Sequence, residues 1–317
     1  MRFVTFVEDG RDRAGVVVGD EVFALPEGVR LVDVIGDTGR LLEAGEEALR
    51  AARLVRPYAS LRLRSPIPGP PTIRDFMTFE RHVEGTAKLA GPDAVIPEQW
   101  YAAPAFYFTN PYAVTGPHDD VAVPPGCTLF DFELEVAAVI GRGGRDIPVE
   151  EAEAHIAGYV LMNDWSARDL QFAEMRVRLG PVKGKDGATT LGPVLITPDE
   201  LVPHRAGNAF ALRMQAAVNG EPVGGDTWSA MAFSYAQMIA YASRGTEVRT
   251  GDVLGSGTCG GGCLAELWGR EGFDAHPPLA PGDVVTLTVE RLGSQECRVV
   301  AGTGPERPVD DLRATRT

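Results

Sequence analysis

The chain has 317 residues, 44% of them hydrophobic, which is enough for one large domain or two smaller ones. Its 44 acidic residues outnumber its 30 lysines and arginines, and a formal net charge of −14 argues against nucleic acids and anionic membranes as partners. No apolar stretch approaches the roughly 20 residues of a membrane span, and we see no export signal, so we expect a cytoplasmic protein. The four cysteines do not suggest a disulfide framework.

The beginning of the chain predicts a small α+β domain. Alternating apolar and polar residues favour a meander of short strands at residues 2–7, 14–19 and 21–25. Residues 41–55 have apolar positions at helical spacing. The segment 65–71, SPIPGPP, has four prolines in seven positions and suits neither a helix nor a central strand. We therefore predict an N-terminal domain over residues 1–65 and a catalytic domain over 66–317.

The second domain is dominated by short strand-like runs. The clearest helical patterns lie at residues 148–160 and 234–245. Because strands and helices do not alternate regularly, we predict an α+β fold, predominantly β, with a curled or sandwiched sheet and not a doubly wound one.

Residues 130–140, FDFELEVAAVI, predict a strand with three acids on one face. Side chains alternate along a strand, so Asp131, Glu133 and Glu135 project to the same side. A divalent cation bound through oxygens would relieve their repulsion, whereas a solvated strand face is the ordinary alternative. Ala137 and Val139 continue the face of the acids, which favours the mouth of a pocket.

A second group of polar residues lies in NDWSARDLQ, residues 163–171. If a helix begins at Asp164, then Asp164, Arg168 and Gln171 share one face of it. Alternatively, Asp164 only caps the helix, and Arg168 is solvated or pairs with Asp169.

Three other segments contain candidates for chemistry. Asp75 precedes His82 by seven residues, in a segment that also suits an ordinary charged helix. Lys183 lies in a glycine-rich loop of the kind that lets backbone amides and a lysine approach an anion, although a plain connector is the alternative. Glu266 is the single acid of the apolar run 264–268, so it is either exposed at an edge or functional.

Together these segments resemble the fumarylacetoacetate hydrolase family over most of the chain, from about Ile73 to Val289. The Glu-x-Glu strand followed by NDWSARDLQ is similar to the signature block of that family. The resemblance implies a site for Mg²⁺ or Ca²⁺, with Mn²⁺ as a further option, whose ligands are Asp75, Glu133, Glu135 and Asp164. Asp131 is then a neighbour of the site.

The resemblance also implies roles for six further residues. Lys183, counted back from Leu-Gly-Pro, matches the lysine of the family's loop. His82 and Glu266 match the pair that activates water in fumarylacetoacetase. The residues implied to contact the substrate are Arg168, Gln171 and Thr258. The implied fold is a mixed β-sandwich roll with a small N-terminal domain, and the implied assembly is a homodimer.

Several positions depart from the family pattern. Gly85 stands where small acylpyruvase-like members have a lid glutamate, and Asn110 stands where they have a lysine. Met77 replaces a substrate-contacting tyrosine.

The implied activity is metal-dependent hydrolysis of a carbon–carbon bond in a 1,3-diketo or 2-oxo acid. The alternatives are an isomerase, tautomerase or decarboxylase of a related 2-oxo diacid such as oxaloacetate, and a non-catalytic protein stabilised by its cation.

Overall fold

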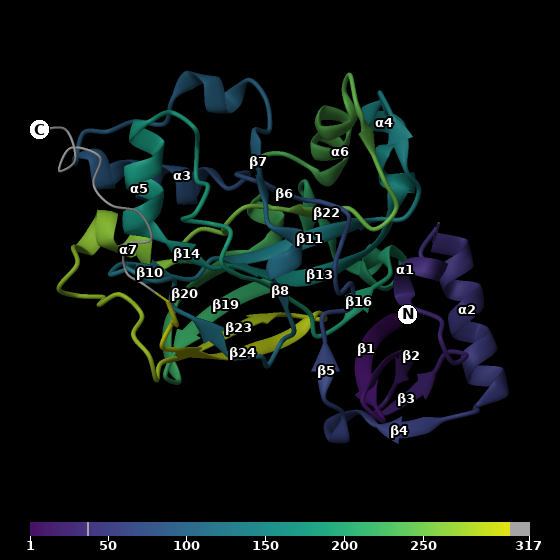
Figure 1. Ribbon diagram of the computed structural model, residues 1–317. Helices are drawn as coiled ribbons and strands as arrows, with labels where there is room; N and C mark the ends of the chain where they lie inside the picture. The colour runs from purple at the N-terminus through teal and green to yellow at the C-terminus, as the bar shows by residue number, and fades with distance from the viewer. Residues whose placement is uncertain (37, 305–317) are drawn as a thin grey trace, which may run out of the picture.

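The computed structural model describes residues 1–36 and 38–304, and its fold is α+β with a predominance of strands (Figure 1). The larger sheet has 13 strands. Its main path runs through β4 (Val55–Pro57), β3 (Glu21–Ala24), β2 (Arg11–Val18), β1 (Arg2–Glu8), β16 (Leu195–Ile196), β13 (Ile156–Asp164), β11 (Leu134–Ile140), β22 (Val253–Gly255), β6 (Ile73–Phe76) and β7 (Phe106–Thr109). The strands that pair beside this path are β5 (Leu63–Arg64), β8 (Val114–Thr115) and β15 (Thr189–Leu191).

The N-terminal part contains the expected meander and helix. Strands β1 to β4 are antiparallel, and the helices that accompany them are α1 (Leu31–Val34) and α2 (Thr38–Ala51). Helix α2 buries Leu41 and Ala48 against the sheet, as its apolar spacing predicts. Strand β1 also pairs with β16, so the meander extends the large sheet. The domain boundary at residue 65 stays a prediction.

The second sheet has five strands and faces the large sheet across the main hydrophobic core. Its order is β20 (Glu221–Thr227), β19 (Arg213–Val218), β23 (Val284–Val289), β24 (Gly293–Val300) and β9 (Val121–Ala122). The remaining short strands form two-stranded pairs: β10 (Phe130–Asp131) with β14 (Ser166–Ala167), β12 (Gly144–Arg145) with β21 (Glu247–Val248), and β17 (Arg205–Ala206) with β18 (Ala209–Phe210).

Helices α3, α5 and α7 gather at one end of the strands in Figure 1. The helices of the second part are α3 (Glu80–Ala87), α4 (Val149–Ala152), α5 (Arg168–Arg176), α6 (Tyr235–Ser243) and α7 (Leu264–Glu271). The 3-10 turns are η1 (Tyr58–Ser60), η2 (Lys88–Ala90), η3 (Glu98–Tyr101), η4 (Pro111–Ala113), η5 (Glu153–His155), η6 (Pro198–His204) and η7 (Trp228–Ala230). Within the described residues, none of the helices has the length and apolar character to span a bilayer.

Three helix predictions need correction. The helix expected over 41–55 ends at Ala51, because Ala52 has a positive φ of 41° and Val55 begins β4. The helix expected over 148–160 ends at His155, because the apolar run that follows is the buried strand β13. The helix considered from Asp164 begins only at Arg168, because Asp164 is the last residue of β13 and pairs with Thr189 of β15. Asp164 therefore does not cap a helix.

The acidic strand at residues 130–140 is interrupted. The N–H of Phe132 donates to Asp131 Oδ1 and the N–H of Glu133 donates to Asn163 Oδ1, so neither joins a strand ladder and β10 is separated from β11. Beyond the break, Ala137 and Val139 pack into the core beside the N-terminal part. The face that carries the acids thus becomes apolar, as expected.

Candidate active site

Four carboxylates from distant segments meet at one point of the large sheet. They can each offer one oxygen such that all four oxygens lie within 4.8 Å of one another, and all four residues are buried: Asp75, Glu133, Glu135 and Asp164. Gly255 of β22 makes this approach possible, because a Cβ there would lie 2.6 Å from Asp75 Oδ1 and 2.9 Å from Glu135 Oε2. The predicted ligand set is therefore brought together.

The oxygens of this cluster suit a hard divalent cation. Asp75 Oδ1, Glu135 Oε1 and Asp164 Oδ1 are buried and have no hydrogen-bond partner. Burial, followed by repulsion from the neighbouring carboxylates, raises the pKa of Glu135 well above the usual range. Burial also raises the pKa of Asp164 well above its usual range, despite the opposing charge of Lys185, and it raises the pKa of Asp75. Mg²⁺ and Ca²⁺ prefer oxygen ligands, and a bound cation would remove both the repulsion and the missing contacts. The donor set fits such an ion.

The structure brings a different lysine to the site from the one predicted. Lys183 is 70% exposed and pairs with Asp186 at 3.0 Å, because the loop backbone is bound to Glu174 of α5 through the N–H groups of residues 182, 183 and 184. Lys185 is buried, with Nζ 2.5 Å from Glu133 Oε2 and 2.6 Å from Asp164 Oδ2. The expectation for Lys183 is corrected, since two lysines in one loop cannot be told apart by spacing.

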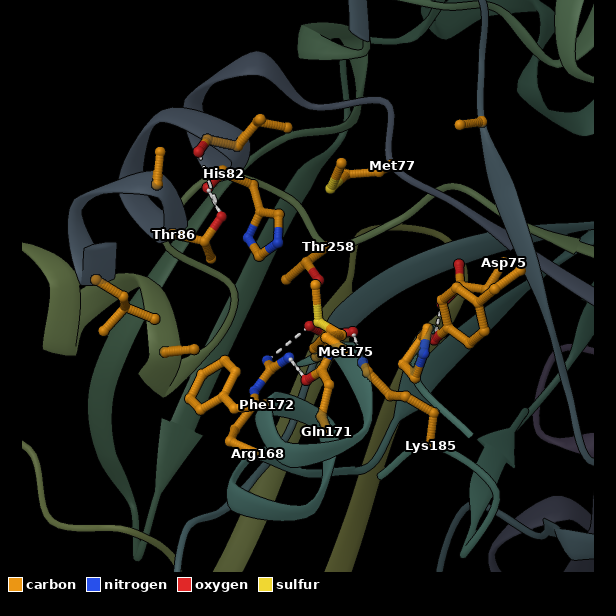
Figure 2. A pocket seen from close by; sticks show the side chains of 18 of the residues that line it. Asp75, Met77, His82, Thr86, Arg168, Gln171, Phe172, Met175, Lys185 and Thr258 are labelled. Carbon is orange, nitrogen blue, oxygen red and sulfur yellow. Dashed lines mark hydrogen bonds and ion pairs between the residues drawn. The ribbon is translucent and has the colours of Figure 1, made fainter. Parts of the chain in front are cut away.

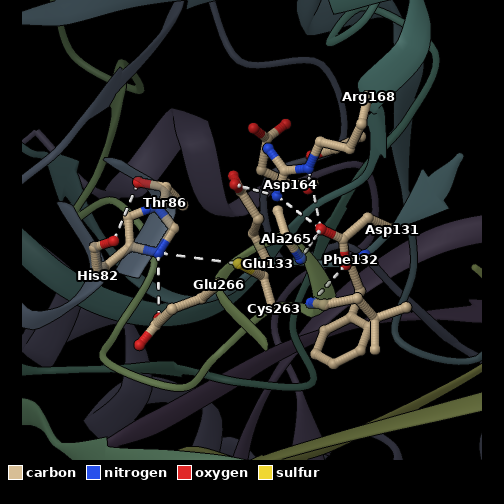
Figure 3. Close-up of polar contacts among 12 residues, drawn as sticks. His82, Thr86, Asp131, Phe132, Glu133, Asp164, Arg168, Cys263, Ala265 and Glu266 are labelled. Carbon is tan, nitrogen blue, oxygen red and sulfur yellow. Dashed lines mark hydrogen bonds and ion pairs between the residues drawn. The ribbon is translucent and has the colours of Figure 1, made fainter. Parts of the chain in front are cut away.

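Asp131 and Arg168 support the cluster from the side. Asp131 accepts hydrogen bonds from the N–H groups of Leu264 and Ala265, at the start of α7, and from Arg168 Nε at 2.9 Å. Arg168 also reaches Glu133 Oε1 at 2.6 Å (Figure 3). Burial alone would raise the pKa of Glu133, but the charges of Arg168 and Lys185 hold it well below the usual range.

These contacts settle two alternatives from the sequence. Asp131 has its oxygens fully engaged with the backbone of α7 and Arg168, so it is a neighbour of the cluster and lies outside the ligand set. Asp169 accepts instead from Thr128, so the suggested pairing of Arg168 with Asp169 is wrong. Arg168 Nη1 further donates to Gln171 Oε1 at 3.1 Å.

A buried histidine and a buried glutamate meet between α3 and α7. His82 Nδ1 lies 3.4 Å from Glu266 Oε2, which also accepts from the N–H of Gly261 at 2.7 Å. Arg270 pairs with the other oxygen of Glu266 at 2.6 Å. Figure 3 shows this pair together with Cys263, whose Sγ is 3.8 Å from His82 Nδ1. A histidine whose Nδ1 faces a carboxylate keeps Nε2 available as a base.

Gly85 explains how Glu266 reaches His82. A Cβ at Gly85 would overlap Glu266 Cγ and lie 3.0 Å from Glu266 Cδ. The glutamate from α7 therefore packs directly against the backbone of α3 at residue 85. This close packing requires glycine at residue 85.

No pattern in the sequence singles out Tyr107, yet this residue belongs to the site. Its hydroxyl donates to Asp75 Oδ2 at 2.9 Å and contacts Asp164 Oδ2. The pairing of β6 with β7 sets Tyr107 directly opposite Asp75, and only this long-range register identifies it. Burial, and then the surrounding carboxylates, raise the pKa of Tyr107 well above its usual value, so the hydroxyl keeps its proton.

The carboxylate cluster and the His82–Glu266 pair both reach one cavity of about 740 Å³ (Figure 2). Its lining includes Asp75 and Glu133 of the carboxylate cluster, together with His82. The predicted substrate-contacting residues Arg168, Gln171 and Thr258 line it as well, and so does Lys185. A substrate in this cavity would therefore contact the cation ligands and the histidine together.

Comparison with known proteins identifies the family. Residues 72–300 match the family model described as fumarylacetoacetate (FAA) hydrolase C-terminal. The chain belongs to the fumarylacetoacetate hydrolase family. The resemblance drawn from the signature block is thereby confirmed, and so is the predominantly β fold, because fumarylacetoacetate hydrolase from Exiguobacterium antarcticum shares it at a TM-score of 0.72. That match has 25% identity and covers 95% of this chain and all of the other.

Curated members of the fumarylacetoacetate hydrolase family that resemble this chain differ in their reactions. Oxaloacetate tautomerase YisK of Bacillus subtilis is 31% identical over 74% of this chain and 72% of its own length. The 2,4-didehydro-3-deoxy-L-rhamnonate hydrolase of Sphingomonas sp. is 35% identical over 59% of this chain and 61% of its own length. The match to the second relative thus spans less than two thirds of that protein. The family includes both hydrolases and tautomerases.

Proposed function

We propose that this protein is a divalent-metal-dependent hydrolase that cleaves a carbon–carbon bond in a 1,3-diketo or 2-oxo acid. The observation that carries the proposal is the buried His82–Glu266 pair, which faces the same cavity as the carboxylate cluster. A cation site alone would suit several reactions. A positioned base next to it adds the means to activate water.

The carboxylate end would bind the reacting part of the substrate. Mg²⁺, Ca²⁺ or Mn²⁺ held by Asp75, Glu133, Glu135 and Asp164 would supply positive charge for the substrate oxygens. Lys185 and Arg168 keep Glu133 ionised and add positive charge at the same end. Gln171 and Thr258 line the cavity and would orient the substrate.

The histidine end would perform the proton transfers. His82 takes a proton from water, the oxygen of that water bonds to the carbonyl carbon, and the adjacent carbon–carbon bond breaks. The carbon that leaves with the electron pair then receives the proton, so the products are a carboxylic acid and a shorter keto compound. Glu266 would hold the imidazole in position and stabilise its protonated form, as the third member of a triad does.

A tautomerase of a 2-oxo acid is the second candidate, and the similarity to oxaloacetate tautomerase YisK favours it. The same site would then move a proton between carbon and oxygen through His82, without addition of water. For either reaction we propose a homodimer, as the family resemblance implies, and a cytoplasmic location, as expected from the sequence.

Labelled water distinguishes the two reactions. With Mg²⁺ and a panel of acylpyruvates and related diketo acids, hydrolysis should place one water-derived oxygen in the acid product. His82→Ala should lower cleavage by about 10² to 10⁴. His276→Ala is a matched control, because His276 forms a partly exposed pair with Glu271 outside the cavity. Isomerisation of the panel with no labelled acid would establish the tautomerase instead.

A further inference from the structure

The cavity has a charged end and an apolar end. The charged end contains Asp75, Glu133, Arg168 and Lys185, and His82 lies above it in Figure 2. Apolar side chains from α3, from the turn η2 and from α5 line the cavity away from the carboxylates: Val83, Ala87, Leu89, Phe172 and Met175. Whatever part of a substrate extends away from the carboxylate cluster will lie against this apolar wall.

The two cations of the cavity are already committed to protein carboxylates. Arg168 pairs with Asp131 and Glu133, and Lys185 pairs with Glu133 and Asp164. Among the described residues that line the cavity, no other lysine or arginine occurs. The hydroxyl of Thr86, a polar group near the apolar wall, donates to the carbonyl oxygens of His82 and Val83. The apolar end therefore offers nothing to neutralise a second carboxylate.

We propose that the substrate is a monocarboxylic keto acid whose far end is an apolar alkyl or aryl group, and that the apolar wall selects against diacids. A carboxylate at that end would lose its hydration without gaining a cation, which strongly disfavours binding. An apolar tail gains from the same burial, by about fourfold in affinity for each methylene group. The reaction assigned to such substrates rests on the proposed function, whereas the binding preference does not.

Two matched pairs of compounds test the proposal. The reactive pair is 2,4-dioxooctanoate and 2,4-dioxooctanedioate, which differ at the far end by a terminal carboxylate. With Mg²⁺ present, kcat/KM should be at least about 100-fold higher for the monoacid. The unreactive pair, 2-oxooctanoate and 2-oxooctanedioate, should show the same order of binding by calorimetry. Equal or tighter binding of the diacid would overturn the inference.

A charge placed in the wall should change this preference. Met175 lines the cavity but is 52% exposed, so Met175→Lys should fold and should reduce the preference for the monoacid about tenfold or more. Val202→Lys adds the same charge at an exposed position outside the cavity and should leave the preference unchanged. An unchanged preference in Met175→Lys would contradict the role of the wall.

The outcomes separate this inference from the proposed function. If neither diketo acid is cleaved but the monoacid binds more tightly, the hydrolase proposal fails and the substrate class stands. If both are cleaved at similar rates and bind equally, the hydrolase proposal stands and the substrate class is wrong.

Discussion

Gly85→Ala should impair the base while leaving the protein folded. The new Cβ would overlap Glu266 Cγ and lie 3.0 Å from Cδ, where ordinary contacts begin at 3.4 Å. Because Cγ is close to the α7 backbone, the carboxylate must swing away. It would then lose its 3.4 Å contact with His82 Nδ1 and its 2.7 Å bond from the N–H of Gly261.

The expected effect on stability is small because two contributions oppose each other. Overpacking of a buried position costs about 1–3 kcal/mol, while replacing glycine by alanine inside a helix gains about 1 kcal/mol. The net loss of about 0–2 kcal/mol is small beside the free energy of unfolding of a typical domain, roughly 5–15 kcal/mol.

Turnover should fall about 10- to 100-fold. This loss is smaller than the full contribution of general-base catalysis, because His82 itself remains.

A double-mutant cycle with Glu266→Ala tests this reasoning. We would measure kcat on the best substrate of the panel and the free energy of unfolding for all four proteins. In the Glu266→Ala background there is no side chain to displace, so Gly85→Ala should cost no further activity and should stabilise α3. Equal losses of activity in both backgrounds, or wild-type activity in Gly85→Ala, would refute the proposed displacement of Glu266.

Two further predictions concern the carboxylate cluster. Lys185→Met should lower kcat/KM by about 10² or more, whereas Lys183→Met, at the surface, should stay within about twofold of wild type. Similar losses in both variants would disprove the assignment of Lys185 as the lysine of the site. The raised pKa values of Asp75, Glu135 and Asp164 mean that, without cations, these groups stabilise the fold at low pH and lose that contribution as pH rises through their folded pKa values. Thermal unfolding in EDTA should therefore show a Tm that falls as pH rises above the ordinary carboxyl range, and the stabilisation by Mg²⁺ should grow with pH. A Mg²⁺ effect independent of pH would contradict this reasoning.

Local sequence predicted only part of the carboxylate cluster, namely the acids that alternate along one strand. The alternation of Glu133 and Glu135 is a property of one extended segment, and the apolar continuation at Ala137 indicated that the face becomes buried. The resemblance added Asp75 and Asp164, and the fold brings all four together. Their function as ligands stays a prediction that cation binding must test.

Residues that depend on loop path or strand register could not be predicted in this way. Lys183 and Lys185 differ only in which side of the loop they occupy, and that side is fixed by hydrogen bonds to Glu174 on another element. Tyr107 enters the site through the register of β6 with β7. The start of α5 is shifted from Asp164 because pairing with β15 keeps that residue extended, which local helix signals do not report.

Asp131 holds two parts of the site together although it lies outside the carboxylate cluster. One carboxylate joins the backbone at the start of α7, which bears Glu266, to Arg168 of α5, so it sets the relative position of the two halves of the site. Replacing it would leave the positive charge of Arg168 incompletely paired and three backbone amides, those of Phe132, Leu264 and Ala265, unsatisfied, a costly combination in a buried place. Such a residue should vary as little between relatives as a true ligand does. Invariance would therefore not distinguish Asp131 from a cation ligand, whereas its hydrogen bonds place it beside the carboxylate cluster.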